Sequence, residues 1–252
     1  MMPKNNGDNW TDEFFGEEIA EFHRSIGPDF TARQVEFVLK RTGVPRGARI
    51  LDVCCGEGRH ALELSRRGYA VVGIDSNKDY LSRARHLARD ESLPVEFVQM
   101  DARELLFGPR FELAINLWTS FGYYDDQTNA SILQRMWRSL VSGGKIFMEM
   151  DNRDNLMGHS MSTTQWRIDD RVTIVQEHNF DYSTSVNRST WTFIRDGRVI
   201  KKFPYFIRVY SCHEIISLLK RTGFGSIEVF GDLKGNPISC DSSMIRVLAT
   251  AC

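Results

Sequence analysis

Two closely spaced glycines follow an acid at the end of an apolar run, in the segment ILDVCCGEGRH (residues 50–60). The pattern Gly56-x-Gly58-x-x-Ala61 matches G-x-G-x-x-G/A, which joins a strand to a helix and binds the pyrophosphate of dinucleotides. Glycine lets the backbone approach a ligand closely, and a helix N-terminus binds anions. The segment therefore predicts a loop that holds a cofactor, but the pattern alone does not identify that cofactor.

Three carboxylates help to decide which cofactor this loop holds. Asp52 ends the first apolar run, Asp75 ends the second (YAVVGID) and Asp101 follows the third (VEFVQM). Ligands of open parallel sheets bind at the carboxyl ends of the strands, so we expect these side chains to line one crevice. Asp52 would repel a pyrophosphate by on the order of a few kcal/mol at an effective dielectric constant of about 20. The loop contains no lysine, and its only cation is Arg59. A cationic cofactor is therefore favoured.

S-adenosylmethionine has the required charges, because it carries a sulfonium, an ammonium and a single carboxylate. We expect the N–H groups near Gly56 and Gly58 to bind the carboxylate, and Asp52 to hold the ammonium directly or through water. Asp75 would accept hydrogen bonds from the ribose, and Asp101 from the adenine amino group. NAD remains an alternative, because Asp75 also lies where a dinucleotide site places its ribose-binding acid.

The elements that position these residues begin near Ala48, where short apolar runs start to alternate with helical stretches. We expect helices over residues 77–89 and 126–140 between strands that include FELAINL and KIFMEM. Such alternation predicts a parallel sheet covered by helices on both faces. A capping-box pattern at Ser211-Cys212-His213-Glu214 opens a last helix, which ends at Gly223 before the strands SIEVFG and SMIRVLAT.

Helices are also predicted ahead of this unit. Apolar residues recur on one helical face between Phe15 and Ile26, which predicts a helix from Thr11 to about Ile26. A capping-box pattern at Thr31 predicts that a second helix opens there, and this helix ends near Gly43.

The alternation breaks near Gly158, where RVTIVQEHNFDY, SVNRSTWTFIRDG and RVIKKFPYFIRVY predict three antiparallel strands. One of the turns, Asp196-Gly197, is typical of a hairpin. We expect this meander to form a lid over the crevice, and it is also a candidate contact for a homo-oligomer. The predicted organisation is a helical cap (1–44), a cofactor-binding α/β domain (45–157 and 209–252) and an inserted antiparallel lid (158–208).

Taken in order, ILDVCCGEGRH, VVGIDSN, FVQMDARE, ELAINLWTSFGYYDD and LVSGGKIFM resemble the class I S-adenosylmethionine-dependent methyltransferases. The resemblance covers residues 45–150, and more weakly the final helix and two strands. It implies a doubly wound, mostly parallel, seven-stranded sheet whose last strand is antiparallel. It also implies that the loop holds the methionine end of the cofactor, that Asp75 contacts the ribose, and that Asp101 and Ala102 contact the adenine.

One departure from that family is Cys54, which stands where the family usually has glycine. A side chain at this position narrows the pocket or requires a shift of the backbone. With this departure noted, the expected cofactor contacts are Asp52, Cys54, Gly56, Gly58, Asp75, Ser76, Asp101, Ala102 and Asn116.

The methyl acceptor is expected to contact the segment that runs from Asn116 to Tyr124. Many enzymes of this family that methylate nucleobase or amide nitrogens carry Asn/Asp-Pro-Pro-aromatic there, and this segment contains no proline. Aromatic faces attract cations by ~0.5–2 kcal/mol. The expected acceptor-binding residues are Trp118, Phe121, Tyr123 and Phe15.

No catalytic base is established by the sequence. A deprotonated amine needs no strong base, whereas a hydroxyl or carbon acceptor usually needs one. Tyr123 and His159 are the candidates for a base, and His178 is a weaker one. We expect a structural or gating role for His60, which belongs to the helix after the glycine loop.

Bulk composition limits the partners. The 252 residues carry a net charge of -1, which provides no basic field for nucleic acid, and no apolar run could span a membrane. Cys54 and Cys55 lack metal-ligand spacing, so no metal is expected. The first ten residues lack the apolar core of a secretory signal, and we expect a cytoplasmic protein.

The predicted function is methyl transfer to a small-molecule amine or hydroxyl. Natural-product N- and O-methyltransferases resemble the chain in layout. The alternatives are an RNA methyltransferase, an NAD-dependent oxidoreductase, and a noncatalytic binding module that retains the cofactor site.

Overall fold

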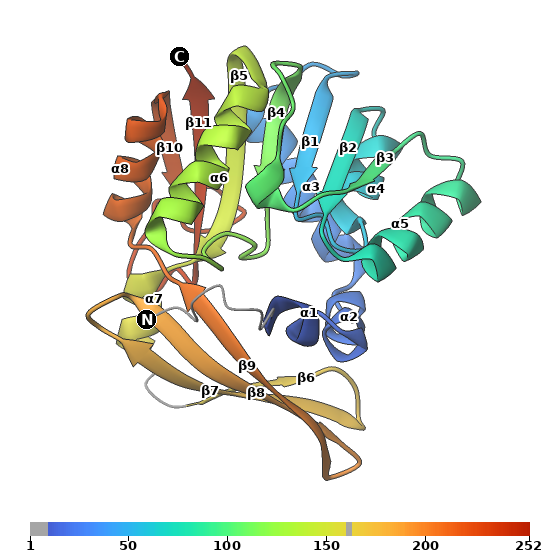
Figure 1. The fold of residues 1–252 in the computed structure, drawn as a ribbon, viewed down its shortest axis with the longest axis vertical. Coiled ribbons are helices and arrows are strands. Elements are labelled where there is room, and N and C mark those ends of the chain that lie inside the picture. The colour runs from blue at the N-terminus through green and yellow to red at the C-terminus, as the bar shows by residue number, and fades with distance from the viewer. Residues whose placement is uncertain (1–9, 160–162) are drawn as a thin grey trace.

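A computed structural model describes residues 10–159 and 163–252, except for the side chains of Asp12 and His159. Seven strands form one sheet in the order β10-β11-β5-β4-β1-β2-β3 (Figure 1). The parallel strands are β1 (Arg49–Val53), β2 (Ala70–Asp75), β3 (Glu96–Gln99), β4 (Phe111–Asn116) and β5 (Leu140–Asp151). The last strand, β11 (Met244–Ala251), runs antiparallel to both β5 and β10 (Phe224–Phe230). The predicted fold class is confirmed.

Helices cover both faces of this sheet (Figure 1). Residues of α3 (Pro28–Thr42), α4 (Arg59–Arg66) and α5 (Lys78–Asp90) share a buried cluster with one face. Residues of α6 (Asp126–Ser139) and α8 (Cys212–Thr222) pack against the other face. Ile50, Leu51 and Val53 are fully buried, as expected for a strand covered on both sides. None of the described helices combines the length and apolarity needed to cross a bilayer.

The N-terminal region differs from the predicted single helix. Two short helices, α1 (Trp10–Phe14) and α2 (Glu17–Arg24), are separated by Phe15 and Gly16. The carbonyl of Phe15 accepts a hydrogen bond from Asn77 Nδ2 at 2.8 Å, and that of Gly16 accepts one from the Tyr80 hydroxyl at 3.0 Å. These contacts with α5 break the helix, and the apolar periodicity of the segment gave no sign of them.

The two predicted capping boxes had different outcomes. At Ser211 the box is present, because Ser211 and Glu214 exchange side-chain-to-backbone hydrogen bonds. At Thr31 the prediction was wrong. Helix α3 begins three residues earlier, with Gly27 as N-cap and Pro28 in the first turn, where its missing N–H costs nothing. The helix ends at left-handed Gly43, as predicted.

A second, antiparallel sheet contains one strand more than predicted. Its order is β6 (Thr163–Arg167), β7 (Val172–Asp181), β8 (Val186–Arg195) and β9 (Arg198–Arg208). Strand β6 is short and lies at the edge, where Trp166 stacks on Trp191 of β8 at a centroid distance of 5.0 Å. The turn at Asp196 and Gly197 has positive φ at both residues, as the predicted hairpin requires. A short helix, α7 (Arg153–His159), precedes this sheet and was not predicted.

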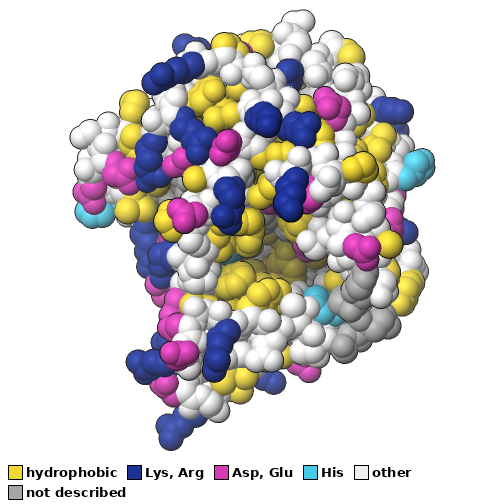
Figure 2. All heavy atoms as spheres, turned by 180° about the vertical axis from the view of Figure 1, so that it is seen from behind, with side chains coloured by type: hydrophobic (Ala, Val, Ile, Leu, Met, Phe, Trp, Pro, Cys, Tyr) yellow, Lys and Arg dark blue, Asp and Glu magenta, His cyan; other side chains and the backbone are white. Residues whose placement is uncertain are grey.

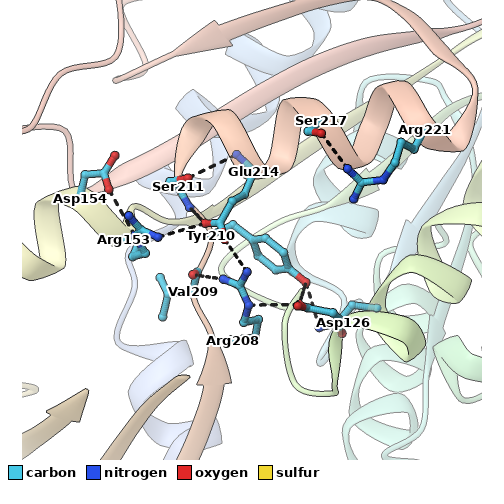
Figure 3. Close-up of polar contacts among 11 residues, drawn as sticks. Asp126, Arg153, Asp154, Arg208, Val209, Tyr210, Ser211, Glu214, Ser217 and Arg221 are labelled. Carbon is cyan, nitrogen blue, oxygen red and sulfur yellow. Dashed lines mark hydrogen bonds and ion pairs between the residues drawn. The ribbon is translucent and has the colours of Figure 1, made fainter. Parts of the chain in front are cut away.

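Arg208 joins the second sheet to the first, as Figure 3 shows. Its side chain is only 10% exposed, and its guanidinium contacts Asp126 of α6 at 3.1 Å and Glu214 of α8 at 2.6 Å. The Arg208 backbone N–H donates to the carbonyl of Gly122 at 2.8 Å. The end of β9 is therefore fixed to the loop that follows β4.

Gly122 should tolerate no side chain, because a Cβ would lie 2.4 Å from the Arg208 carbonyl oxygen and the residue has φ +116°. Gly143, with φ +72° and open space around it, is a matched control. We expect Gly143→Ala to cost about 1–2 kcal/mol of unfolding free energy from backbone strain alone. We expect Gly122→Ala to cost a further ~1–3 kcal/mol because the backbone must move. Denaturant unfolding of both variants measures the difference, and equal losses would contradict the clash.

Candidate cofactor and acceptor site

A cavity of about 570 Å³ lies at the carboxyl ends of the parallel strands. Its walls come from the glycine loop, the loop after β4, helices α1 and α2, and strands of the second sheet. Figure 2 shows a recess lined by hydrophobic side chains on one face of the molecule. The volume is within the ~300–1,000 Å³ typical of small-molecule sites.

Ion pairs fasten α2 over the mouth of the glycine loop. Glu57 of that loop accepts from Arg24 of α2 and from Arg83 of α5, both at 2.8 Å. Glu17 of α2 pairs with the same two arginines. The N-terminal helices are thereby held against the cofactor loop and α5.

The backbone of the glycine loop is left-handed at three residues. Cys54 has φ +60°, Gly56 +58° and Gly58 +80°. Cys54 therefore adopts the conformation that glycine would favour, at a cost on the order of 1–2 kcal/mol. Cys54 also lines the cavity.

The two glycines differ from the expectation that their N–H groups bind an anion. The Gly56 N–H donates to Asp75 Oδ2 at 2.8 Å, and the Gly58 N–H donates to the Cys55 carbonyl at 3.0 Å. Gly58 is buried, and a Cβ there would lie 2.7 Å from the Phe97 ring. Packing between the loop and β3 explains that glycine, while Gly56 lines the cavity.

The three predicted carboxylates lie around one thiol. Burial raises the pKa of Cys54 well above its usual range, and the charges of Asp75, Asp101 and Asp52 raise it further. Asp75 and Asp101 line the cavity together with Ser76 and Ala102. Asp52 is instead buried beneath the loop, close to the N–H of Ala61 in α4.

Several buried polar atoms around the loop have no hydrogen-bond partner in the described structure, namely Asp52 Oδ2, Arg59 Nη2 and Asn116 Oδ1. Burial lowers the pKa of Arg59 to about 10, which leaves it charged at neutral pH. Arg59 Nη1 donates to Thr31 and Gln34, both at 2.9 Å, and its guanidinium lies 4.9 Å from the Trp118 ring centroid. Unsatisfied buried groups are costly, so this end of the cavity suits a polar, zwitterionic ligand.

The side chain and the backbone N–H of Arg103 bind the Asp101 carboxylate. Burial would raise the pKa of Asp101, but hydrogen bonds from the Arg103 side chain and N–H outweigh it and lower the pKa. The guanidinium of Arg103, in the 3-10 turn η1 (Ala102–Glu104), also lies over the Tyr124 ring at 4.6 Å. Arg103 thus fixes the orientation of the Asp101 carboxylate at the wall of the cavity.

The acceptor end is built from the loop after β4 and from α1 and β9. Tyr123 packs edge-to-face on Phe15, Trp10 and Tyr205 at centroid distances of 5.6–6.2 Å. Phe121 also lines the cavity, but it is 3% exposed and packs on Tyr210 in the main core. All four predicted acceptor residues (Trp118, Phe121, Tyr123 and Phe15) line the cavity.

The predicted candidates for a base are placed as follows. Burial and the neighbouring Tyr205 raise the pKa of Tyr123 well above its usual range, so its hydroxyl stays protonated. His60 contacts Gln34 at 3.1 Å, and burial lowers its pKa so that the ring is neutral. His178 lies between Thr164 and Asn187 and is not among the residues around the cavity. The side chain of His159 lies outside the described residues.

Asp151 is a cavity residue that the sequence analysis missed. It ends the apolar strand KIFMEMD, which is the same signal that identified Asp52 and Asp75. Its carboxylate accepts from the Thr119 hydroxyl at 3.1 Å, and burial raises its pKa to about 6. Tyr205 and Thr119 also line the cavity, and no local pattern distinguished them in the sequence.

Burial raises the pKa of Asp52 from 3.8 to about 7, which gives a testable dependence of stability on pH. Between these two values the unfolded chain has lost the Asp52 proton while the folded chain keeps it. The unfolding free energy should therefore fall as pH rises, by up to about 1.4 kcal/mol per pH unit from this group. We expect this decline to be absent in Asp52→Asn, and the difference between the two proteins to level off above pH about 7. A constant difference across that range would show that Asp52 titrates normally.

The comparisons with known proteins agree with this geometry. A family model described as a methyltransferase domain matches residues 50–144. Glycine/sarcosine N-methyltransferase of Halorhodospira halochloris is 24% identical over 236 residues, which cover 90% of this chain and 84% of that protein. The similarity to this relative thus extends well beyond the cofactor loop.

Solved structures show the same fold. The CcbJ methyltransferase of Streptomyces caelestis matches with a TM-score of 0.78 at 18% identity, covering 90% of this chain and 91% of that one. CalS10 of Micromonospora echinaspora, an amino pentose methyltransferase solved with S-adenosylmethionine bound, matches with a TM-score of 0.69 at 19% identity, covering 94% and 98%. Together these findings show that the chain has the fold of the class I S-adenosylmethionine-dependent methyltransferases, and that its residues 50–144 match a methyltransferase domain.

Proposed function

We propose that this enzyme transfers the methyl group of S-adenosylmethionine to a small molecule that is enclosed with the cofactor in one cavity. The observation that carries the proposal is the continuity of the cavity. It runs from Asp75 and Asp101 at the strand ends to the aromatic group around Tyr123. The N-terminal helices and the second sheet contribute its cover, which we propose acts as the lid.

The polar end of the cavity fits the cofactor's charges. Arg59 Nη2, which has no partner in the described structure, would bind the methionine carboxylate, since the glycine N–H groups are occupied. Asn116 Oδ1 would accept from the ammonium, with the Asp52 carboxyl group buried beneath the loop. Asp75 would bind the ribose hydroxyls through its remaining lone pairs. The adenine would lie beside Asp101 and Ala102, near Ser76.

The bound cofactor would supply an electrophilic methyl group on its sulfonium. The chain's own contribution is alignment of the acceptor and exclusion of water, which can lower the barrier by ~7–11 kcal/mol. Aromatic faces at Tyr123 and Phe15 would favour a substrate with apolar or cationic character.

A small acceptor with an amine or hydroxyl group suits this site. The relative and the neighbour named above are an N-methyltransferase acting on glycine or sarcosine and an amino pentose methyltransferase. The cavity volume and the net charge of -1 favour a metabolite over RNA. Association of two chains through the second sheet remains a prediction.

The acceptor class can be tested with methyl-labelled cofactor. The purified enzyme is incubated separately with a panel of small amines and alcohols and with transfer RNA, and the products are analysed by mass spectrometry. We expect label in members of the small-molecule panel only. Label in RNA would favour an RNA methyltransferase. Calorimetric binding of NADH without binding of S-adenosylmethionine would contradict the assignment of the cofactor site.

Asp75 gives a test of the cofactor contacts. We expect Asp75→Asn to weaken S-adenosylmethionine binding by about 1.5–3 kcal/mol, because hydrogen bonds to a charged carboxylate are lost. Asp79→Asn, the same change at an exposed position four residues further on, should leave the affinity unchanged. Isothermal titration calorimetry measures both, and thermal unfolding checks that the glycine loop survives. Equal affinities in the two variants would remove Asp75 from the site.

A further inference from the structure

A further strand-end carboxylate, that of Asp151, lines the cavity at the end that the proposed cofactor contacts do not use. Asp151 ends β5, and β4 separates this strand from β1 in the sheet order. Two strand spacings correspond to about 10 Å. Asp151 is therefore displaced along the sheet edge from the carboxylates around Cys54.

The neighbours of Asp151 place it among the acceptor-end aromatic residues. Burial raises the pKa of Tyr123, and the neighbouring Tyr205, Cys54 and Asp151 raise it further. Burial and Asp151 likewise raise the pKa of Tyr205. Tyr123 therefore lies near both Cys54 and Asp151.

No cation among the described residues pairs with the Asp151 carboxylate. Oδ1 accepts from Thr119 at 3.1 Å, and no hydrogen bond from a described residue reaches Oδ2. The groups that influence it are its buried surroundings, Thr119 and a second acid, Glu149, while Tyr123 and Tyr205 are neutral. Glu149 is itself paired with Arg246 at 2.7 Å. A carboxylate enclosed in this way is stabilised by a cationic ligand.

The loop after β4 holds Asp151 in place at a cost in backbone strain. Trp118 and Thr119 are successive non-glycine residues with left-handed backbones, φ +63° and +56°. Such residues cost on the order of 1–3 kcal/mol each and cluster at functional sites. The Thr119 N–H donates to the Glu149 carbonyl at 3.1 Å, and its hydroxyl donates to Asp151. The strained pair thus orients one carboxylate oxygen of a residue that lines the cavity.

We infer that Asp151 binds the acceptor through an amine nitrogen and stabilises the positive charge that this nitrogen gains during methyl transfer. This inference rests on the proposed function and narrows its acceptor to amines. The lone pair of a neutral amine forms the new N–C bond while the S–C bond breaks and its electrons stay on sulfur. One positive charge therefore moves from the sulfonium to the nitrogen. A carboxylate fixed at the acceptor end favours that movement.

A hydroxyl acceptor would use the same carboxylate differently. A hydroxyl must lose its proton as it reacts, and a general base works best when its pKa lies near the operating pH. Burial raises the pKa of Asp151 to about 6, so with a hydroxyl acceptor this carboxylate would have to act as the base, because Tyr123 stays protonated. A neutral amine needs no base, and the ammonium that it becomes is bound by the carboxylate, so a preference for amine over alcohol separates the two roles.

The test compares an amine with its matched alcohol. Binding of benzylamine and of benzyl alcohol is measured by calorimetry on the full chain saturated with S-adenosylhomocysteine, above the pKa of Asp151. We expect the wild type to bind the amine at least about tenfold more tightly, and Asp151→Asn to lose most of that preference. Asp154→Asn, the same change at an exposed position in α7, should keep it.

A second pair of variants acts on the carboxylate without replacing it. Thr119→Val removes the hydroxyl that orients Asp151 and should reduce the amine preference several-fold, whereas Thr119→Ser should retain it. Failure of the wild type to bind amine, equal affinity for amine and alcohol, or an unchanged preference in Asp151→Asn would each overturn the inference. If the wild type did not bind S-adenosylmethionine, the proposed function itself would be contradicted. Failure of the inference and failure of the proposed function are therefore distinguishable.

Discussion

The shared direction of five parallel strands is the constraint on which the site depends. Because β1 to β5 point the same way, their carboxyl ends meet at one edge of the sheet. Acids that are distant in the chain, from Asp52 to Asp151, are thereby collected along that edge. Their spacing across the strands separates the end on β1 to β3, where we propose that the cofactor binds, from the end on β4 and β5, where we propose that the acceptor binds.

The cover of this edge is held by a separate hydrophobic cluster. Phe14 and Ile19 of the N-terminal helices pack with Phe193, Phe203 and other residues of the second sheet. Polar contacts at two places join this cover to the main sheet, namely Arg208 with α6 and α8, and Glu57 with Arg24 and Arg83. At each place one largely buried side chain, Arg208 or Glu57, pairs with partners that are more exposed.

Three of the six non-glycine residues with left-handed backbones in the described part of the chain line the cavity. They are Cys54 in the glycine loop, and Trp118 and Thr119 in the loop after β4. Both loops follow central strands, whose buried hydrogen bonding can support such conformations. The strain at Thr119 has a visible result, because it aligns a hydroxyl with Asp151.

The sequence by itself determined the sheet, the cofactor loop and the order of the strand-end acids. An apolar run that ends in an acid indicates both a buried strand and the position of its carboxyl end, and this signal is local. The early start of α3 has a local signal, Pro28 in the first turn, which the capping-box interpretation overlooked. The break at Gly16 and the edge strand β6 depended on tertiary contacts that no local pattern encodes. The same holds for the site. Packing between elements far apart in the chain decides which carboxylate reaches the cavity, which N–H groups are already bonded, and which side chain contacts Asp151. Only the tertiary structure decided that Gly58 serves packing, that Asp52 lies beneath the loop, and that Arg59 offers a partnerless donor.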